Sequence, residues 1–570
     1  MLVETMSKGG EDASAAIRGR LRATVRRRRA FLVAALVALA AILLFVPEQT
    51  SAPSGVVRVP SSVYVPAGVT PPNPGYASGV AVSGVRCGPG VRQVPWSAYA
   101  PPCEPVWHGN NGGATSPGVT AKTITISYRE AATSQLTALY AFVPPSVIGT
   151  NQEEINTMNA YLNTFNKTFE LYGRKVVLAP FQGKGDFISE DLGQDQAQAQ
   201  EDAVTVATSL HAFADMSLID SSAVYATDLA LQHVVTSTLY ENAASWYQKL
   251  SPWEYTPGPN CTKTAAAAGA ILGKQLGGLP AKFAGSSALR SKTRTYGIIY
   301  PENPEAATCM NEDVAALAKY GQAVKAKVGF KFSLTQMVPS SQNAVAQMKA
   351  AGVTTVILSS TDPISPIFMM QAANKENYHP EWWFQSYFAG GETNTDTFTR
   401  LFPLNQAAHI IGAGNQAQPL ANQEAIRAYY LGNPPPGQKP IPSFAFTYQS
   451  LLQFFDALQL AGPDLTPANF EAAMKLIPKS APSGMFGGWN GRSGPYDPAS
   501  GYHVVRFDQS AVSALDGKKG AFIACDANAL FSYSNAANVP AHKQLWCSQS
   551  QGVVHAKTSY PVPGGYAGSG

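Results

Sequence analysis

Strand-like and helix-like segments alternate along the middle of this 570-residue chain, in two separate series. The first series runs through segments predicted at 122–128, 151–173, 174–182, 194–210, 212–220 and 223–235. The second runs through 294–303, 304–321, 329–338 and 341–352, and it ends with a strand, polar loop, helix and strand at 354–386. Such alternation predicts parallel sheets with helices on both faces. Because single cores stop growing near about 250–300 residues, two series predict two α/β lobes.

The N-terminal segment carries the basic excess of the chain. Residues 1–30 hold eight Lys and Arg and three acids, whereas the rest holds 33 basic and 34 acidic residues. The body is therefore not basic, which argues against a nucleic-acid-binding surface. Four arginines at 26–29 precede the uncharged apolar run FLVAALVALAAILLFV at 31–46. This pattern predicts a cytoplasmic tail (1–30) and a single-pass transmembrane signal-anchor (31–46), with the body extracytoplasmic. A cleaved signal peptide is the alternative.

Proline, glycine, serine and valine dominate residues 47–120, and this composition predicts a semi-extended spacer before the body. All six cysteines follow the apolar run. An even number of cysteines in an exported chain predicts disulfides. Several pairings are open, and we favour pairing in sequence order, which joins Cys87 to Cys103, Cys261 to Cys309 and Cys525 to Cys547.

Four segments, in this order, resemble the type I periplasmic binding proteins of the leucine/isoleucine/valine-binding kind. They are YGIIYPENPEAATCMNEDVAAL (296–317), the segment at 354–386, FAFTYQSLLQFFDALQLAGPDLTPANFEAAM (444–474), and the glycine-rich turn and strand at 483–508. The resemblance covers about 121–510 and implies two Rossmann-like lobes, joined by a hinge, that close on a small ligand. It implies lobe 1 at 121–258 and 410–482, lobe 2 at 259–409 and 483–515, and a cysteine-containing C-terminal extension at 516–570.

Candidate ligand-binding residues of the first lobe lie where its predicted strands end, since ligands of open parallel sheets bind beyond the carboxyl ends of the strands. Ser221 and Ser222 in DSSAVYATD resemble the family's serine-rich carboxylate loop. The alternative is that one of them caps the following helix. Further candidates are two hydroxyl residues in the next loop, an aromatic residue that walls the cleft or packs between the lobes, and two residues at the end of the first strand: Ser237, Thr238, Tyr255, Tyr128 and Arg129.

In the second lobe the resemblance places Thr361, in SSTDP, over the ligand, and Tyr387 where amino-acid binders carry their ammonium-binding acid. A tyrosine hydroxyl can hydrogen-bond an ammonium group but cannot neutralise it. Glu302 and Glu305 in YPENPEA offer substitute carboxylates. The alternative for these two acids is stabilisation of a helix dipole.

The sequence offers no pattern for metal binding or catalysis: its histidines lack metal-ligand spacing, and phosphate-loop, dinucleotide and nucleophile-elbow motifs are absent. We therefore expect no metal, no cofactor and no enzymatic activity. The leading hypothesis is a membrane-tethered extracytoplasmic solute-binding protein that captures an amino acid, an amide or a small carboxylate, with an ABC transporter permease as its partner. The alternatives are a ligand-sensing surface receptor on the same fold and a cell-envelope interaction protein that binds no ligand.

Overall fold

A computed structural model describes residues 78–551, except 219, 240, 334, 361, 386–392, 415–423, 481–487, 495 and 514–515. The predicted tail, the predicted anchor and much of the predicted spacer lie outside the described residues, and so do Thr361 and Tyr387. Within the described part of the chain, no helix has the length and apolarity needed to cross a membrane.

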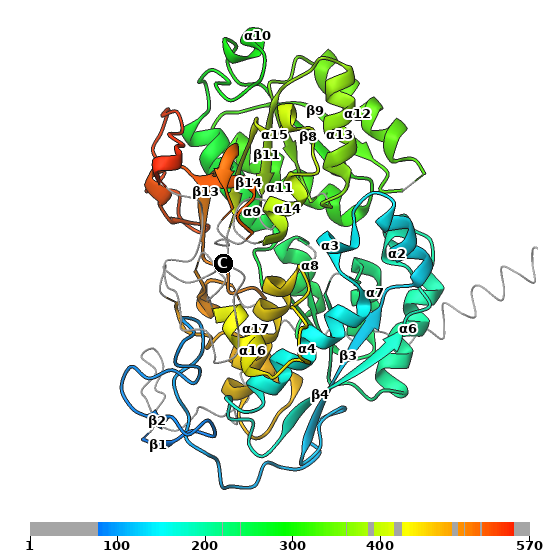
Figure 1. Cartoon of the computed structure of the whole chain (residues 1–570), viewed down its shortest axis with the longest axis vertical. Helices are drawn as coiled ribbons and strands as arrows, with labels where there is room; N and C mark the ends of the chain where they lie inside the picture. Colours follow the sequence, from blue (N-terminus) through cyan, green and yellow to red (C-terminus); the bar gives the residue numbers. More distant parts are fainter. Residues whose placement is uncertain are drawn as a thin grey trace, which may run out of the picture. The chain divides into compact units, whose positions relative to one another are not determined.

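The first lobe is built on a parallel sheet with the strand order β4-β3-β5-β6-β7. The strands are β3 (Thr123–Glu130), β4 (Lys175–Gln182), β5 (Ala214–Leu218), β6 (Val235–Thr238) and β7 (Glu254–Tyr255). Helices cover both faces of this sheet (Figure 1). The helices of this lobe are α2 (Thr133–Tyr140), α3 (Pro145–Ile148), α4 (Asn151–Phe165), α5 (Phe187–Asp191), α6 (Gln196–Thr208), α7 (Ala223–Leu231), α8 (Ala244–Leu250), α16 (Glu424–Leu431), α17 (Phe444–Ala461) and α18 (Pro467–Met474).

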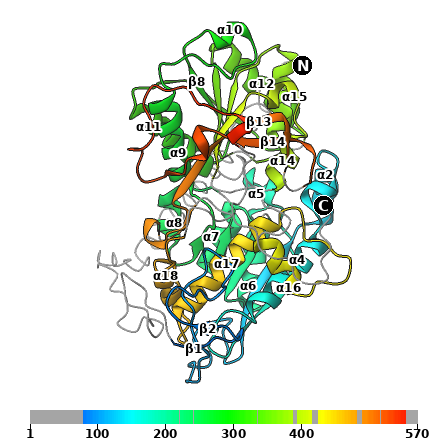
Figure 2. The same ribbon diagram turned by 60° about the vertical axis from the view of Figure 1, so that its left-hand side comes forward.

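Helices α4 and α17 lie side by side on this sheet, and aromatic rings fill the space between them (Figures 1 and 2). The ring of Phe165 in α4 lies 5.7 Å from that of Tyr448 and 5.1 Å from that of Phe455, both in α17. All three side chains are fully buried. Because α17 is buried along its whole length, the C-terminal part of the chain is built into the core of the first lobe.

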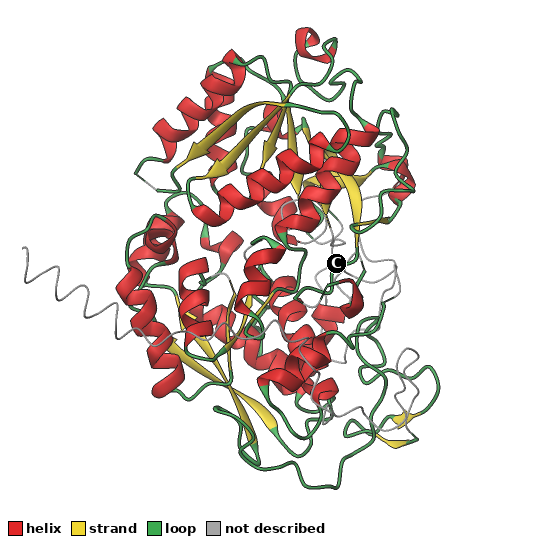
Figure 3. Ribbon diagram, turned by 180° about the vertical axis from the view of Figure 1, so that it is seen from behind, coloured by secondary structure: helices red, strands yellow, loops and turns green. Residues whose placement is uncertain are grey.

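The second lobe contains a larger sheet (Figure 3). Its strand order is β14-β13-β12-β11-β10-β8-β9, in which β8 to β12 are parallel and β13 and β14 are antiparallel. Its strands are β8 (Tyr296–Pro301), β9 (Val324–Phe330), β10 (Thr355–Leu358), β11 (Glu381–Gln385), β12 (Ile410–Gly414), β13 (Gly501–Val512) and β14 (Lys519–Ala524). Its helices include α9 (Cys261–Ala268), which continues as a π-helix over Gly269–Gln275, and α10 (Ser287–Arg290), α11 (Pro304–Ala318), α12 (Met337–Ala350), α13 (Ser365–Lys375), α14 (Thr393–Thr399) and α15 (Leu404–Ala407).

Four of the predicted boundaries are wrong. The spacer does not extend to residue 120, because Val94, Tyr99 and Ala100 are buried in the hydrophobic core. Residue 410 does not return the chain to the first lobe, because β12 pairs with β11 in the second sheet. The described part of the segment 516–570 is not a separate extension, since β14 pairs with β13 and β15 (Phe531–Ser532) pairs with the other end of β13. The strand expected at 329–338 is β9, which ends at Phe330, and α12 starts at Met337.

Three disulfides confirm the predicted pairing in sequence order. Cys87 is bonded to Cys103, Cys261 to Cys309 and Cys525 to Cys547, and these bonds account for all six cysteines. The first closes a loop beside the short strands β1 (Gly79–Val80) and β2 (Arg86–Cys87), the second joins α9 to α11, and the third joins the end of β14 to the C-terminal segment.

Segments that pass between the two sheets are hydrogen-bonded to each other. The Thr256 backbone N–H donates to the Tyr496 carbonyl at 3.0 Å, and Asn260 Nδ2 donates to Asp497 Oδ2 at 2.6 Å. Lys263 forms an ion pair with the same Asp497 carboxylate. These contacts hold two crossings of the chain together between the two sheets.

Candidate functional site

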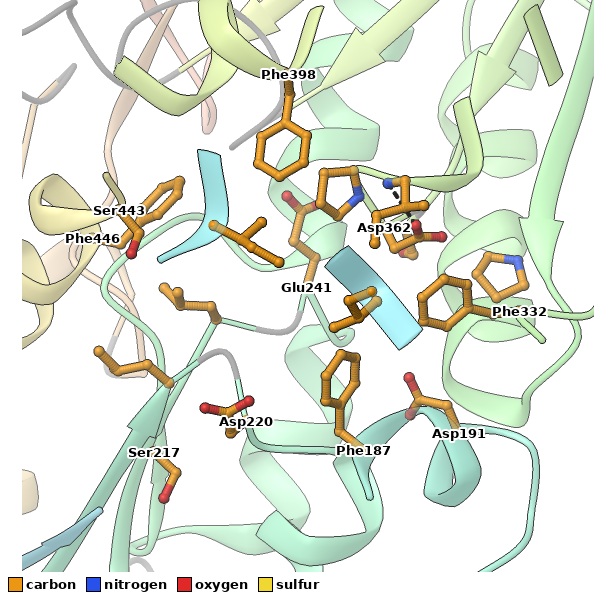
Figure 4. Close-up of a pocket in the computed structure, with 18 of the residues that line it drawn as sticks. Phe187, Asp191, Ser217, Asp220, Glu241, Phe332, Asp362, Phe398, Ser443 and Phe446 are labelled. Atoms are coloured by element: carbon orange, nitrogen blue, oxygen red, sulfur yellow. Dashed lines mark hydrogen bonds between the residues drawn. The ribbon is translucent and has the colours of Figure 1, made fainter. Parts of the chain in front are cut away.

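A cavity of about 280 Å³ lies between the carboxyl ends of the two sheets. Both lobes contribute to its wall, which includes Tyr128 at the end of β3, Leu358 at the end of β10 and Gln385 at the end of β11. Figure 4 shows Phe187 and Asp220 on one side of the space, facing Phe398 and Asp362 on the other. Its position agrees with the rule that open parallel sheets bind ligands beyond the carboxyl ends of their strands.

Most of the cavity wall is apolar. Aliphatic side chains such as Leu139, Leu218 and Ile364 line it, together with six phenylalanines: Phe187, Phe332, Phe384, Phe398, Phe402 and Phe446. Burial of apolar surface contributes roughly 25 cal/mol per Å², so a ligand with a large hydrocarbon part gains most of its binding energy here.

Carboxyl groups supply much of the polar part of the wall. Six acids line the cavity, namely Glu154, Asp191, Asp220, Glu241, Glu305 and Asp362. No lysine, arginine or histidine is among the described residues that line it. An anionic ligand would therefore find no cationic side chain in the described wall.

Two of these acids, Glu154 and Asp220, belong to the first lobe. Glu154 Oε1 accepts a hydrogen bond from Thr447 Oγ1 at 2.7 Å, and Asp220 Oδ2 accepts one from the Tyr128 hydroxyl at 3.2 Å. Burial raises the pKa of Glu154 to about 7, against the lowering effect of the Thr447 hydrogen bond, and the nearby Asp220 raises it further. Burial likewise raises the pKa of Asp220 to about 7, although Tyr128 and the charge of Arg129 oppose the shift.

We expect the ligand-free protein to become less stable between pH 5 and pH 8, in part because of Glu154. Its proton is bound more tightly in the folded state than in the unfolded state, so stability falls as pH rises from the ordinary glutamate pKa to about 7. Glu154→Gln removes this loss and keeps an acceptor for Thr447. Urea denaturation should find the variant more stable than the wild type by about 3 kcal/mol at pH 8 and by less than about 1 kcal/mol at pH 5.

A suitable control is Glu201→Gln, since the Glu201 side chain is 57% exposed. This change should leave the pH dependence as in the wild type. Equal stability of Glu154→Gln and the wild type at both pH values would contradict the raised pKa.

In the second lobe, the starts of two helices form the wall. Asn303 caps α11, where its side chain accepts from the Ala306 backbone N–H, and Glu305 follows in the first turn. Asp362 Oδ1 accepts hydrogen bonds at 2.7 Å from the backbone N–H groups of Ile364 and Ser365 at the start of α13. These side chains follow β8 and β10 because each strand leads directly into a helix at the same edge of the sheet.

Of the residues singled out from the sequence, Tyr128 and Glu305 line this cavity. Ser237 and Tyr255 line a smaller space of about 10 Å³ beneath β6 and β7, and Thr238 is buried on β6. The Tyr255 hydroxyl donates to the Pro252 carbonyl at 2.9 Å, and its ring packs edge-on against Phe470. Glu302 is exposed and is not one of the lining residues.

Ser221, Ser222 and Arg129 lie behind the cavity wall. Ser222 caps α7 by accepting from the Tyr225 backbone N–H at 3.0 Å, which is the capping role that the sequence left open. Its hydroxyl also donates to Glu190. The Arg129 guanidinium is paired with Glu190 and Asp202, at 2.5 Å and 3.0 Å. Arg129 was a candidate ligand-binding residue, and these ion pairs engage its guanidinium within the first lobe instead.

Sequence reasoning missed most of the cavity wall. Asp220 stands in the same DSSAVYATD stretch as the serines, so its place between a strand and a helix was a signal that could have found it. Ser360 and Asp362 flank Thr361 in the polar loop and line the cavity. The phenylalanines and Glu154 carried no local signal, because helix and loop residues far apart in the chain bring them to the wall.

Comparison with known structures identifies the fold. The chain matches a fatty acid ABC transporter substrate-binding protein from Thermomonospora curvata at 16% identity and a TM-score of 0.50, covering 77% of this chain and all of that one. It also matches the leucine-, isoleucine-, valine-, threonine-, and alanine-binding protein from Brucella ovis in its closed conformation, at 16% identity and a TM-score of 0.50, over 78% and 100% of the two chains. The fold is that of the type I periplasmic binding proteins. No family model and no curated protein sequence matches the chain.

This likeness agrees with the fold expected from the sequence, with two α/β lobes and parallel sheets. The cavity described above lies between these lobes, and its wall is drawn from the carboxyl ends of both sheets.

Proposed function

We propose that this protein is an extracytoplasmic solute-binding protein that encloses a largely apolar small molecule between its lobes. The observation that carries the proposal is the cavity of about 280 Å³ at the carboxyl ends of both sheets, with apolar walls from each lobe. Binding works as a population shift, because a ligand that touches both lobes stabilises the conformation in which they approach each other. The protein acts by capture and release, without chemistry.

The ligand class in this proposal differs from the amino acid, amide or small carboxylate expected from the sequence. An ionised carboxylate in the cavity would face acids, with no lysine or arginine among the described lining residues. Burying a charge without a partner costs several kcal/mol. An apolar ligand avoids this cost and gains from contact with six phenylalanines.

Export and tethering belong to the same proposal. Three disulfides are typical of an oxidising, extracytoplasmic compartment. The tetra-arginine tail and apolar run at 26–46 would hold the protein at the membrane with its body outside. We infer delivery to an ABC importer as the use of the captured solute; a sensing role would instead require a signalling partner.

A thermal-denaturation screen tests the binding function. The full-length protein, held in lipid nanodiscs, is titrated with apolar alcohols, amines, amides, carboxylates and amino acids. We expect a saturable rise in Tm with at least one apolar class, since a ligand that binds only the folded state stabilises it by mass action. The absence of any saturable rise across the panel would favour the envelope protein that keeps the fold and binds nothing.

A further inference from the structure

The charge distribution of the cavity wall defines the solute more narrowly than its apolar character does. All of the charged side chains among the described lining residues are acids, and they come from both lobes. Glu154, Asp191 and Asp220 belong to the first lobe, and Glu305 and Asp362 to the second. A solute held between the lobes therefore meets carboxyl groups on both sides.

The cation whose charge acts on Asp220 is already engaged in ion pairs. Arg129 acts on Asp220 through its charge, but its guanidinium forms ion pairs with Glu190 and Asp202. The other influences on Asp220 are the Tyr128 hydroxyl, which donates to it, and Asp186, whose charge opposes ionisation. Glu154 receives a hydrogen bond from Thr447, and Asp220 opposes its ionisation.

Three further polar atoms in the wall, all in neutral side chains, are buried and have no hydrogen-bond partner among the described residues. They are the hydroxyl oxygens of Ser443 and Ser360 and the side-chain nitrogen of Asn242, and the residues Ser443 and Asn242 are 1% and 3% exposed. All three residues line the cavity, and Figure 4 shows Ser443 at its edge beside Phe446. Because buried polar groups in native proteins are nearly always hydrogen-bonded, these atoms point to a ligand or its water shell as their partner.

The six phenylalanines of the wall also favour a cationic ligand over an anionic one, as the acids do. The face of an aromatic ring carries partial negative charge, which attracts a cation and repels an anion. We propose that the solute is an apolar molecule with a basic nitrogen, whose protonated amine is held by the carboxyl groups of Asp220 and Glu154 while its hydrocarbon part packs on the phenylalanine-rich wall. This inference rests on the proposed solute-binding function and specifies its substrate class.

The test uses three probes of one shape and different charge: 4-phenylbutylamine, 4-phenylbutanol and 4-phenylbutyrate. Isothermal titration of the full-length protein in nanodiscs should show the amine binding at least tenfold more tightly than the alcohol, and the carboxylate weakest. Amine binding should also release protons near pH 7, because the ammonium group lowers carboxyl pKa values that burial has raised to about 7. The alcohol should release none.

Substitutions of the two carboxyl groups test where the amine binds. Asp220→Asn should weaken amine binding at least tenfold and leave alcohol binding within threefold, and the nearly isosteric Glu154→Gln should act in the same direction. Asp228→Asn is the matched control, because Asp228 lies on α7 but is not a lining residue. Circular dichroism confirms that each variant folds.

The outcomes test the basic nitrogen and the solute-binding function separately. Equal binding of amine and alcohol, or tightest binding of the carboxylate, would overturn the basic nitrogen while supporting an apolar solute-binding protein. Failure of all three probes to bind would count against both.

Discussion

Replacing Arg129 with methionine is expected to lower the free energy of unfolding by about 3–5 kcal/mol, the usual cost of removing one partner from a buried ion pair. The Arg129 side chain is 2% exposed, and those of Glu190 and Asp202 are 0% and 2% exposed. Methionine fills a similar volume but leaves two buried carboxylates without their cation. Both would have to ionise in an apolar environment or take up protons.

The same change should also disturb the cavity, because the partners of Arg129 hold its wall. Glu190 lies in α5 and accepts from Ser222, the cap of α7. Asp202 accepts from the backbone N–H groups of Lys184 and Gly185, which fixes the loop between β4 and α5. Gly185 is required there, since an added Cβ would collide with Glu190 and with Arg129. We therefore expect weaker ligand binding even in the fraction of Arg129→Met that remains folded.

Lys184→Met is the matched control for this substitution. Lys184 forms an ion pair with Glu201 in the same lobe, but their side chains are 55% and 57% exposed. Exposed ion pairs contribute about 0–1 kcal/mol, so urea denaturation should place this variant within about 1 kcal/mol of the wild type. If Arg129→Met lost no more stability than Lys184→Met, the ion pairs of Arg129 with Glu190 and Asp202 would not stabilise the cavity wall as described.

Strand and helix identity could be predicted from the sequence because buried parallel strands are short continuous apolar runs. Thr355–Leu358 and its neighbours show this pattern, and each is followed along the chain by a helix. The limits of β9 could not be predicted in this way, since pairing with β8 sets them: Tyr296 is opposite Val324 and Pro301 is opposite Phe330. The alternating residues beyond Phe330 have no neighbouring strand to pair with there.

The local sequence pattern also could not show to which of the two sheets a strand belongs. The apolar run of β12 predicts a strand in either lobe, and its place is decided by pairing with β11 on one side and β13 on the other. The contact between β12 and β13, whose paired residues are about 90 positions apart, is not visible in short windows of sequence. β14 follows β13 directly along the chain and pairs with it, so it belongs to the same sheet and not to a C-terminal extension.

The candidate site was predictable in position more than in chemistry. Strand ends pointed to Tyr128 and to the loop around Asp220, and both lie at the cavity. The hydroxyls expected to bind a carboxylate are instead buried behind it, as Ser222 shows by capping α7 and donating to Glu190. Glu154 and Phe446 reach the wall only because α4 and α17 pack together, so the acidic and aromatic character of the cavity required the tertiary structure.

Glu381→Gln is expected to destabilise the protein by about 3–5 kcal/mol without changing the affinity of the folded protein for its solute. Glu381 pairs with Arg294 through two hydrogen bonds, to Nε at 2.8 Å and Nη2 at 2.9 Å, and neither side chain is exposed. Its carboxylate also accepts from Thr355 at 2.7 Å and from the Phe283 backbone N–H at 3.0 Å. Glutamine keeps the shape but leaves the Arg294 charge buried without a counter-ion.

We expect Glu381→Gln to leave the affinity unchanged because the Glu381–Arg294 pair lies at the end of the second sheet that faces away from the cavity. Glu381 begins β11, whereas the cavity is lined by Gln385 at the opposite end of the same strand. Glu376→Gln is the control, because Glu376 pairs with Lys349 where both side chains are about half exposed, and its loss should cost no more than about 1 kcal/mol. Urea denaturation measures the stability of each variant, and titration with 4-phenylbutylamine measures its affinity. An equal loss of affinity in Glu381→Gln and Arg129→Met would contradict this prediction. It would show that a change at the start of β11 alters binding at its other end, and that the Glu381–Arg294 pair does not affect stability alone.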